Sequence, residues 1–455
     1  MEATAIVEGL RASFVAGKTR SLGWRLEQLA GIRRMTTERR ADIHAALAKD
    51  LGKPDLEAFL TETAYTVASA GYVEKRLKGW MRPEKVRTEL IFRPATSRIH
   101  REPYGVALII GPWNYPFQLV MTPLIGAVAA GNCAVVKPSE VSPATSALIA
   151  DMLPRYVDPS CVKVVEGGVP ETTALLKERF DYIFYTGSPA VGRIVMAAAA
   201  RHLTPVTLEL GGKNPCIVDR DVDLEVAVRR ILWGKYTNAG QTCLAPDYIL
   251  AHEGIHDELL EQLKKGITEC YGADPQRSPD YGRIVNGRHF TRVMKLMGSG
   301  EVVVGGQSNA DQRYVAPTVL KDVAPDSPVM AEEIFGPILP VLSVPNIEHA
   351  ISFANARPKA LALYIFSRDK DVQRRVIEAT SSGGASINHA WYHVGVQGLP
   401  FGGVGESGMG AYHGRASFET FAHRKSVLDK PTFPDLPLTY PPYTEGKKKW
   451  IQRLL

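Results

Sequence analysis

Between residues 105 and 210, short apolar segments alternate with longer amphipathic ones, and this alternation restricts the fold more than any other feature of the chain. The run over 106–110 is wholly apolar, as expected of a strand buried on both faces. Repeated strand–helix–strand units predict a parallel, doubly wound α/β sheet with helices on both sides. Further strands are expected at 133–137, 162–165, 181–186 and 206–210, and helices at 117–130, 143–155, 170–179 and 190–202.

The flanking regions differ from this pattern. Residues 1–80 carry apolar positions at three- and four-residue spacings and predict helices. Residues 86–104 predict two short strands, joined near 94–96 as a hairpin arm. A second alternating region runs from about 214 to 390, and the last 30 residues are rich in proline and predict an extended tail. A chain of 455 residues is expected to fold as two or three substructures.

Composition and cysteine usage exclude several classes of protein. The net charge of +6 is spread along the chain, with one concentrated patch at 447–449, which argues against nucleic acid as a partner. The five cysteines are widely spaced and form no CxxC pair, and no HExxH occurs, so neither a disulfide framework nor a metal site is expected. The N-terminus does not read as a secretory signal and no apolar run is long enough to span a bilayer, so we expect a cytoplasmic protein.

Cys243 and Glu209 indicate the chemistry. Each lies in its own glycine-rich turn, Gly240-Gln241-Thr242-Cys243 and Glu209-Leu210-Gly211-Gly212. A thiol is a nucleophile and a carboxylate can activate water, so the pair suggests covalent catalysis. The alternative for a lone thiol in such a loop is packing.

The turns that follow the predicted strands offer ligand-binding groups, because ligands bind at the carboxyl edge of open α/β sheets. Asn114 is a neutral amide donor that could stabilise an oxyanion. Lys137 and Glu140 suit a ribose, although a solvated turn is the alternative. Free N–H groups at 187–192 suit a pyrophosphate, against a plain strand-to-helix turn. The literal GxGxxG at 403–408 follows no strand and is better read as a tight glycine loop.

Seven segments in order carry a resemblance to a known family. They are Gly111-Pro112-Trp113-Asn114, Lys137-Pro138-Ser139-Glu140, Thr186-Gly187-Ser188, Glu209-Leu210-Gly211-Gly212-Lys213, Gly240-Gln241-Thr242-Cys243, Glu333-Ile334-Phe335-Gly336-Pro337 and Pro400-Phe401-Gly402-Gly403. In this order they resemble the aldehyde dehydrogenase superfamily over roughly residues 1–430. The short N-terminus and the run 407–414 are similar to its class 3 branch, which includes fatty and aromatic aldehyde dehydrogenases.

The resemblance implies a role for each matched residue. Cys243 matches the nucleophile, Glu209 the general base, and Asn114 the oxyanion donor acting with the backbone N–H of Cys243. The implied cofactor contacts are Trp113, Lys137, Glu140, Gly187, Ser188, Gly192, Glu333, Phe335 and Phe401, and the implied aldehyde tunnel is lined by Tyr65, Tyr115, Trp233 and Thr242. Asn388-His389 departs from the Asn-Asp of class 3 relatives, which leaves the local polarity of the tunnel open.

The fold implied is a Rossmann-type NAD(P)-binding domain (1–85 and 105–209), a second α/β catalytic domain (210–392), a small β oligomerisation arm (86–104 and 415–435) and a C-terminal tail (436–455). We expect NAD as cofactor, with NADP as the alternative, because Glu140 would repel a 2′-phosphate while Lys137 would attract it. A homodimer paired through the arm is expected. For the basic tail, which lacks the hydrophobic anchor of membrane-bound relatives, a solvated end is favoured over peripheral membrane contact.

The reaction implied is oxidation of a medium- or long-chain aliphatic, or aromatic, aldehyde to its acid through a cysteine thiohemiacetal and thioester, then hydrolysis. A CoA-acylating member, in which a thiol resolves the thioester, is one alternative, and Glu209 argues against it because that branch does not need the base. A catalytically silent binding protein on the same fold is the other, and the intact Cys243, Glu209 and Asn114 weigh against it.

Overall fold

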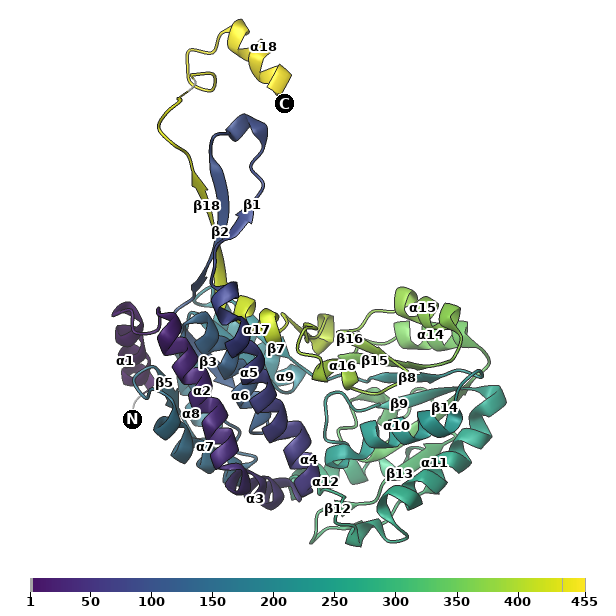
Figure 1. The fold of residues 1–455 in the computed structure, drawn as a ribbon. Helices are drawn as coiled ribbons and strands as arrows, with labels where there is room; N and C mark the ends of the chain where they lie inside the picture. The colour runs from purple at the N-terminus through teal and green to yellow at the C-terminus, as the bar shows by residue number, and fades with distance from the viewer. Residues whose placement is uncertain (1–2, 436, 455) are drawn as a thin grey trace.

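Two sheets that lie in neighbouring lobes and one projecting arm organise the chain in the computed structural model, which describes residues 3–435 and 437–454 (Figure 1). The first sheet has six strands in the order β17-β7-β6-β3-β4-β5, and all pairs are parallel except β17 with β7. Its strands are β3 (Val106–Ile110), β4 (Cys133–Lys137), β5 (Val162–Val164), β6 (Tyr182–Thr186), β7 (Val206–Glu209) and β17 (Gly408–Met409).

Both faces of the six-stranded sheet are covered by helices, as its apolar strands require. Every residue of β3 is buried, and alternate side chains enter different hydrophobic clusters. Ala107 and Ile109 pack in one cluster, whereas Val106 and Leu108 pack in a second with Leu10 of the first helix. The helices of this lobe are α1 (Ala3–Val15), α2 (Leu22–Glu38), α3 (Arg40–Leu51), α4 (Asp55–Ala58), the π-helical turn η1 (Phe59–Thr63), α5 (Ala64–Trp80), α6 (Gln118–Ala130), α7 (Pro143–Tyr156), α8 (Val169–Lys177) and α9 (Pro189–Ala200).

The second lobe is built on a seven-stranded sheet in the order β10-β13-β14-β9-β8-β15-β16, parallel except for β10 with β13. Its strands are β8 (Pro215–Val218), β9 (Tyr248–His252), β10 (Glu301–Val304), β13 (Thr318–Lys321), β14 (Ile338–Val344), β15 (Ala362–Phe366) and β16 (Gly384–Ile387). Its helices are α10 (Leu224–Tyr236), α11 (His256–Tyr271), α12 (Gly287–Met294), α13 (Pro328–Ala331), α14 (Ile347–Asn355), α15 (Lys370–Ala379) and α16 (Tyr392–Gly395). A short pair, β11 (Ser308–Asn309) and β12 (Tyr314–Val315), lies beside it.

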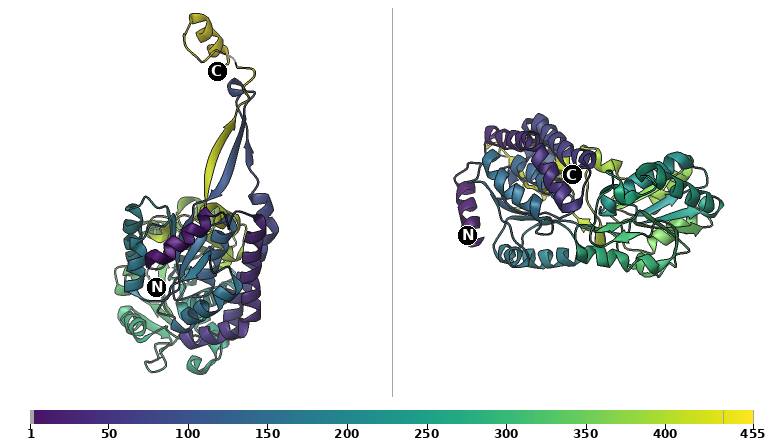
Figure 2. Two further views of the ribbon diagram at one scale, coloured as in Figure 1. Left: turned by 90° about the vertical axis from the view of Figure 1, so that its left-hand side faces the viewer. Right: turned by 90° about the horizontal axis from the view of Figure 1, so that it is seen from below.

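An antiparallel, three-stranded arm in the order β1-β2-β18 projects away from both lobes (Figure 2). It joins β1 (Glu84–Val86) and β2 (Thr96–Pro103) to β18 (Ala422–Asp429), which follows α17 (Gly414–Thr420). The chain ends beyond the tip of the arm in α18 (Glu445–Leu454). Within the described ranges, every helix is too short or too polar to traverse a lipid bilayer.

The structure confirms the doubly wound sheet and its alternation with helices. The strands over 106–110 and 133–137 have the expected bounds. The strands β5, β6 and β7 begin and end within one residue of expectation, whereas β17 was not predicted. The literal GxGxxG at 403–408 is a tight loop that ends in β17, as expected. The prediction of a fully extended tail was wrong, because residues 445–454 form a helix. The prolines lie at or before 442, so the segment after them retains every backbone N–H that a helix needs.

Candidate active site

The candidate site lies where the carboxyl ends of the six-stranded sheet face the loops of the second lobe. Lys137 ends β4 and Glu209 ends β7, while the loop carrying Asn114 follows β3. Parallel strands present their carboxyl ends on one edge, so this topology gathers groups that lie far apart in the sequence. The Asn114 amide Nδ2 donates to the carbonyl oxygen of Gln241 at 3.0 Å, which joins this edge to the loop that carries Cys243.

The loop before Cys243 has an unusual backbone. Asn238, Ala239 and Gly240 follow one another with φ of 56°, 51° and 75°, in the left-handed region. Only glycine adopts this region without steric cost. At Gly240 a Cβ would also lie 2.3 Å from the carbonyl oxygen of Gly336, so a side chain is excluded there. The neighbouring residues must therefore hold this conformation by other bonds.

Buried side-chain amides supply those bonds. Asn238 Nδ2 donates to the carbonyl oxygens of Asn114 at 2.9 Å and Gln241 at 3.1 Å. The Gln241 amide donates to Asn238 O and Arg283 O and accepts from the Val285 N–H, all at 2.9 Å. On the other side of the nucleophile, Asn214 Nδ2 donates to the carbonyl oxygen of Cys243 at 2.7 Å. The backbone on both sides of Cys243 is thereby fixed.

Burial dominates the electrostatics of the Cys243 thiol. Burial raises its pKa well above the ordinary range, and the charges of Glu333 and then Glu209 raise it further. The backbone N–H groups of Cys243 and Leu244 point toward the sulfur and act in the opposite direction. The thiol is thus neutral in this arrangement, with two carboxyl groups within electrostatic reach.

Glu209 is buried at the end of β7, 2% exposed. Neither of its carboxyl oxygens has a hydrogen-bond partner among the described residues. Burial raises its pKa well above the usual value, because desolvation disfavours the charged form. An unpaired buried carboxyl is rare in folded proteins and marks a place where a ligand or water completes the bonding.

Glu333 lies against the glycine turn that follows Glu209. A Cβ on Gly211 would overlap its Oε2, so the carboxyl packs on the glycine backbone. Burial first and the charge of Asp247 second raise the pKa of Glu333 to about 8, while the Gly212 N–H and Lys213 act to lower it. Its Oε1 has no partner in the described part of the chain.

The position of Glu333 is fixed through its backbone. Lys213 pairs with Asp247 and donates to the carbonyl oxygens of Val329 at 2.8 Å and Glu332 at 3.0 Å. Asp247 in turn accepts from the Ile334 N–H at 3.0 Å. The turn after Glu209 and the loop of Glu333 are thereby held together.

The residues that the sequence assigns to the dinucleotide have charges and positions that suit its binding. Lys137 is buried, and its Nζ donates to Pro138 O at 2.7 Å and lies 3.2 Å from Glu140, whose side chain is 47% exposed.

Ser188 caps α9, and the first turn of that helix carries no acidic residue. Helix N-termini favour anions, so this turn suits a pyrophosphate. The buried Thr186 Oγ1, unpartnered among the described residues, adds a free polar group at the same edge. Gly187 and Gly192 lie in this turn, where added side chains would overlap Tyr185 and Leu210.

The aromatic residues expected near the cofactor fall into two groups. Trp113 and Phe335 meet edge to face with ring centroids 5.1 Å apart. Phe401 instead stacks on His413 at 5.2 Å and packs against Tyr412. The structure therefore brings Trp113 and Phe335 together, whereas Phe401 packs with another set of rings.

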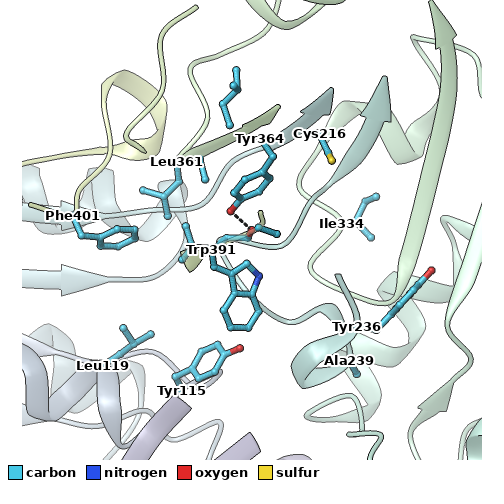
Figure 3. Packing of buried hydrophobic residues seen from close by; sticks show 14 of the residues in the cluster. Tyr115, Leu119, Cys216, Tyr236, Ala239, Ile334, Leu361, Tyr364, Trp391 and Phe401 are labelled. Atoms are coloured by element: carbon cyan, nitrogen blue, oxygen red, sulfur yellow. Dashed lines mark hydrogen bonds between the residues drawn. The ribbon is translucent and has the colours of Figure 1, made fainter. Parts of the chain in front are cut away.

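Three of the four residues expected in the tunnel lie, together with Trp391, in one series of neighbouring side chains that reaches the surface. Tyr115 hydroxyl and Thr242 Oγ1 lie 2.7 Å apart, next to Cys243. Figure 3 shows the Trp391 ring facing Tyr115, with centroids 6.5 Å apart. Trp391 packs on Trp233 at 4.5 Å, and Trp233 is 37% exposed. Tyr65 lies elsewhere, donating to Val394 O at 3.0 Å beside His413.

Sequence reasoning did not single out Asn214 or Trp391. Asn214 directly follows the Glu209–Lys213 segment, so its place after a glycine turn was the available signal. Trp391 lies beside the departure at Asn388-His389, and the density of aromatic residues there was its signal.

Comparisons with known sequences agree with this geometry. The model of the family described as "Aldehyde dehydrogenase family" matches residues 1–427. "Aldehyde dehydrogenase, dimeric NADP-preferring" of Rattus norvegicus is 53% identical over 93% of this chain and 94% of that protein. "Aldehyde dehydrogenase family 3 member A2" of Mus musculus is 50% identical over 98% of this chain and 93% of that protein.

Solved structures give the same result. A substrate-bound state of Staphylococcus aureus AldH superposes with a TM-score of 0.97 at 47% identity, covering 99% of this chain and 98% of that one. An indole-3-acetaldehyde dehydrogenase complexed with NAD⁺ superposes with a TM-score of 0.87 at 26% identity, covering 94% and 89%.

Removing the charge of Glu333 should make Cys243 more reactive. Because Glu333 raises the pKa of the thiol, Glu333→Gln should lower that pKa and speed alkylation by iodoacetamide several-fold at pH 9. The effect should shrink at pH 6.5, below the pKa of about 8 of Glu333, where its carboxyl is already neutral. Mass spectrometry of the Cys243 peptide measures the rate. Glu332→Gln, at the exposed neighbouring residue, is the control and should leave the alkylation rate of Cys243 unchanged. An acceleration equal at both pH values would contradict this coupling.

Proposed function

The chain belongs to the aldehyde dehydrogenase family, and we propose that Cys243, Glu209 and Asn114 perform its catalytic steps. It is an oxidoreductase that converts aldehydes to carboxylic acids with NAD(P). The observation that carries the assignment is the buried, unpartnered Glu209 carboxyl within electrostatic reach of the Cys243 thiol.

Cys243 is the nucleophile of this proposal. Its thiolate adds to the aldehyde carbon and gives a tetrahedral alkoxide. The thiol is neutral at rest, so a base must take its proton before attack, and either nearby carboxyl group can do so in its deprotonated form. The bonds from Asn214 and Gln241 keep the sulfur in place while its bonding changes.

Asn114 stabilises the alkoxide. Its Nδ2 carries two hydrogens, and one bonds the Gln241 carbonyl, which leaves the second for the oxyanion. The Cys243 N–H already points toward the sulfur and supplies the second donor. Fixed donors of this kind cost no reorganisation when charge develops, which makes them effective in a buried site.

Glu209 activates the water that hydrolyses the thioester. A carboxylate with a raised pKa is a stronger base than an ordinary one once it is deprotonated. Its two free oxygens allow it to accept a water proton without breaking an existing bond. The position at the end of β7 directs it to the same edge as Asn114 and Lys137.

Lys137, Glu140 and the N-terminal turn of α9 hold the dinucleotide in this proposal, with Glu333 and Phe335 toward the nicotinamide end. When bound, the nicotinamide ring supplies the hydride acceptor. We assign residues 1–85 and 105–209 to the cofactor domain and 210–392 to the catalytic domain. A cytoplasmic location fits the five cysteines, which are all free.

Medium- or long-chain aliphatic and aromatic aldehydes are the proposed substrates. Rings line the route from Thr242 outward, through Tyr115, Trp391 and Trp233. Binding to such a surface is favourable for aliphatic and aromatic chains, because it removes their apolar area from water, whereas small polar aldehydes have little such area. A CoA-acylating reaction does not require the base that Glu209 provides, and a silent protein would have no use for an unpaired buried carboxyl.

Aldehyde oxidation is tested with NAD and NADP against aldehydes from propanal to decanal and benzaldehyde, followed by nicotinamide absorbance. Long-chain and aromatic aldehydes should give the higher kcat/KM. Cys243→Ser should lower turnover on the order of 10⁴-fold or more while cofactor binding, measured by calorimetry, stays near normal. Full activity in this variant would remove the nucleophile assignment. Dependence of turnover on added coenzyme A would favour the acylating alternative.

Glu209→Gln should separate hydride transfer from hydrolysis. We expect a burst of reduced cofactor, close to one per active site, followed by steady turnover slowed on the order of 10²–10⁴-fold. Since the base works deprotonated and its pKa is raised, the wild-type steady rate should fall as pH decreases, and the variant should lose this dependence. Stopped-flow absorbance between pH 6 and 9 measures both. A linear, full-rate progress curve would exclude Glu209 from the mechanism.

We also propose a homodimer formed through the arm. The arm, a three-stranded sheet that projects away from both lobes, exposes Leu90 (66%), Phe92 (51%) and Leu428 (57%). Exposed apolar side chains on a sheet with open edges favour association with another chain. The rat relative is described as dimeric, which supports the same arrangement.

Analytical ultracentrifugation should give twice the chain mass of 49.8 kDa for the wild-type protein. Leu428→Asp introduces a charge into the proposed contact and should shift the protein toward monomer at micromolar concentration. Val15→Asp places the same charge at a more exposed apolar residue, 72% accessible on α1, and should leave the dimer intact. A wild-type monomer, or a Leu428→Asp dimer of unchanged strength, would contradict the arm contact.

A further inference from the structure

Lys53 and Glu62 form an ion pair that is buried completely beneath the loop of Asn114. Lys53 Nζ lies 2.6 Å from Glu62 Oε1, and both side chains are 0% exposed. Lys53 follows α3, and Glu62 lies in the π-helical turn η1. Such turns are rare and occur frequently at functional sites. Neither residue touches Cys243 or Glu209 in any described hydrogen bond, so the mechanism above does not use them.

The lysine reaches the Asn114 loop directly. Its Nζ donates to the backbone carbonyl oxygen of Asn114 at 3.2 Å and lies 4.0 Å from the centre of the Tyr115 ring. The same carbonyl accepts from Asn238 Nδ2 at 2.9 Å. One oxygen atom therefore receives a donor from the N-terminal segment and a second from the loop of the nucleophile.

The glutamate holds the other end of the loop. Its Oε2 accepts from the backbone N–H groups of Phe117 at 3.2 Å and Gln118 at 2.8 Å, at the start of α6. These are N–H groups that a helix leaves without an internal partner, and a carboxylate there also opposes the positive end of the helix dipole. The two side chains together bond the loop on both sides of Tyr115.

Stability alone does not account for a fully buried pair. Removing two charges from water is costly, and replacing such pairs by apolar residues is often neutral or stabilising. Where a buried pair gives a defined geometry, its value lies in that geometry. Here the geometry is that of the backbone carrying Asn114.

We propose that Lys53 and Glu62 are positioning residues, which hold the Asn114 amide in register with Cys243 for stabilising the oxyanion. This inference rests on the proposed function, in which Asn114 is the oxyanion donor. A displacement of about 1 Å in a catalytic group can cost about 10²-fold in rate. Loss of the pair should therefore reduce kcat while leaving the nucleophile itself intact.

The test uses the full-length double variant Lys53→Met/Glu62→Gln. It removes both charges together and so avoids leaving one buried charge unpaired, while the Gln oxygen still accepts from the N–H groups of α6. We expect kcat for decanal to fall about 10- to 100-fold, with KM for NAD(P) within twofold of wild type. Alkylation of Cys243 by iodoacetamide passes through no oxyanion, so its rate should stay at the wild-type value.

A purely structural role gives a different result. If the pair only supports the fold, kcat and the alkylation rate should change in parallel, or neither should change, and either outcome overturns the proposal. Lys53→Met alone leaves the Glu62 carboxylate on the two N–H groups of α6, where the helix dipole also compensates its charge, so it is the second variant should the double variant fail to fold. It should show a fall in kcat with the wild-type alkylation rate. An unchanged kcat in Lys53→Met, where the double variant fails to fold, also overturns it.

Two controls separate this proposal from the function on which it rests. Arg11→Met breaks a 2.8 Å ion pair with Asp181, which joins α1 to the same sheet but does not contact the Asn114 loop. It should keep the wild-type kcat whatever its effect on the urea unfolding midpoint. If the wild-type protein oxidises no aldehyde, the proposed function fails. If the wild-type enzyme is active and the variants match it, only the positioning role fails.

Discussion

Desolvation where the two sheets face one another is the constraint on which the site depends. Cys243, Glu209 and Glu333 all become negative when they ionise, and burial raises the pKa of each. Burial together with like charge favours the neutral forms, because charge repulsion is strong where water is excluded. Each group is then a strong base or nucleophile once its proton leaves, which is what attack and hydrolysis at one carbon require.

The chain holds these groups with bonds that add little charge near the sulfur. The left-handed backbone at 238–240 is strained. It is retained because the Asn238 and Gln241 side-chain amides bond backbone carbonyls of this loop, while the Glu57 carboxyl accepts from the Asn238 N–H at 3.0 Å. Such amides give direction to the bonds without shifting the pKa of the thiol by a formal charge. Formal charges are used further away, as in Lys213 with Asp247 and Lys53 with Glu62, where each cation is matched by a carboxylate.

The sheets were predictable from the sequence because their strands are read from local composition. A wholly apolar run such as 106–110 admits few conformations once helices flank it, and its bounds agreed with expectation. The helix at 445–454 was not predicted, because the prolines that precede it dominated the composition of the whole segment. Cys243 and Glu209 were also predicted from local sequence, because each lies beside a glycine-rich turn.

Partners across long separations were beyond such reasoning. Glu62 lies among other charged residues on a helical segment and Lys53 lies in a polar turn, a pattern typical of a solvated surface, yet both side chains are fully buried. Their burial follows from the loop at 114–118, more than fifty residues away, whose carbonyl and N–H groups need donors and acceptors. No local pattern specifies that need, because it arises only when α3 and η1 pack against the start of α6.

At the ribose end of the proposed site, one charged group is held in place and the other can move. Lys137 is buried and its Nζ is bonded to Pro138, so its charge keeps one position. Among the residues that the structure describes, the Glu140 side chain is bonded to that lysine alone, at 3.2 Å, and it is 47% exposed, so it can turn toward solvent at little cost. In the proposed binding mode a ribose hydroxyl would meet both groups, whereas a 2′-phosphate would displace the carboxylate and keep the ammonium. A fixed cation beside a movable anion therefore accommodates NAD and NADP alike, in agreement with the family's use of both.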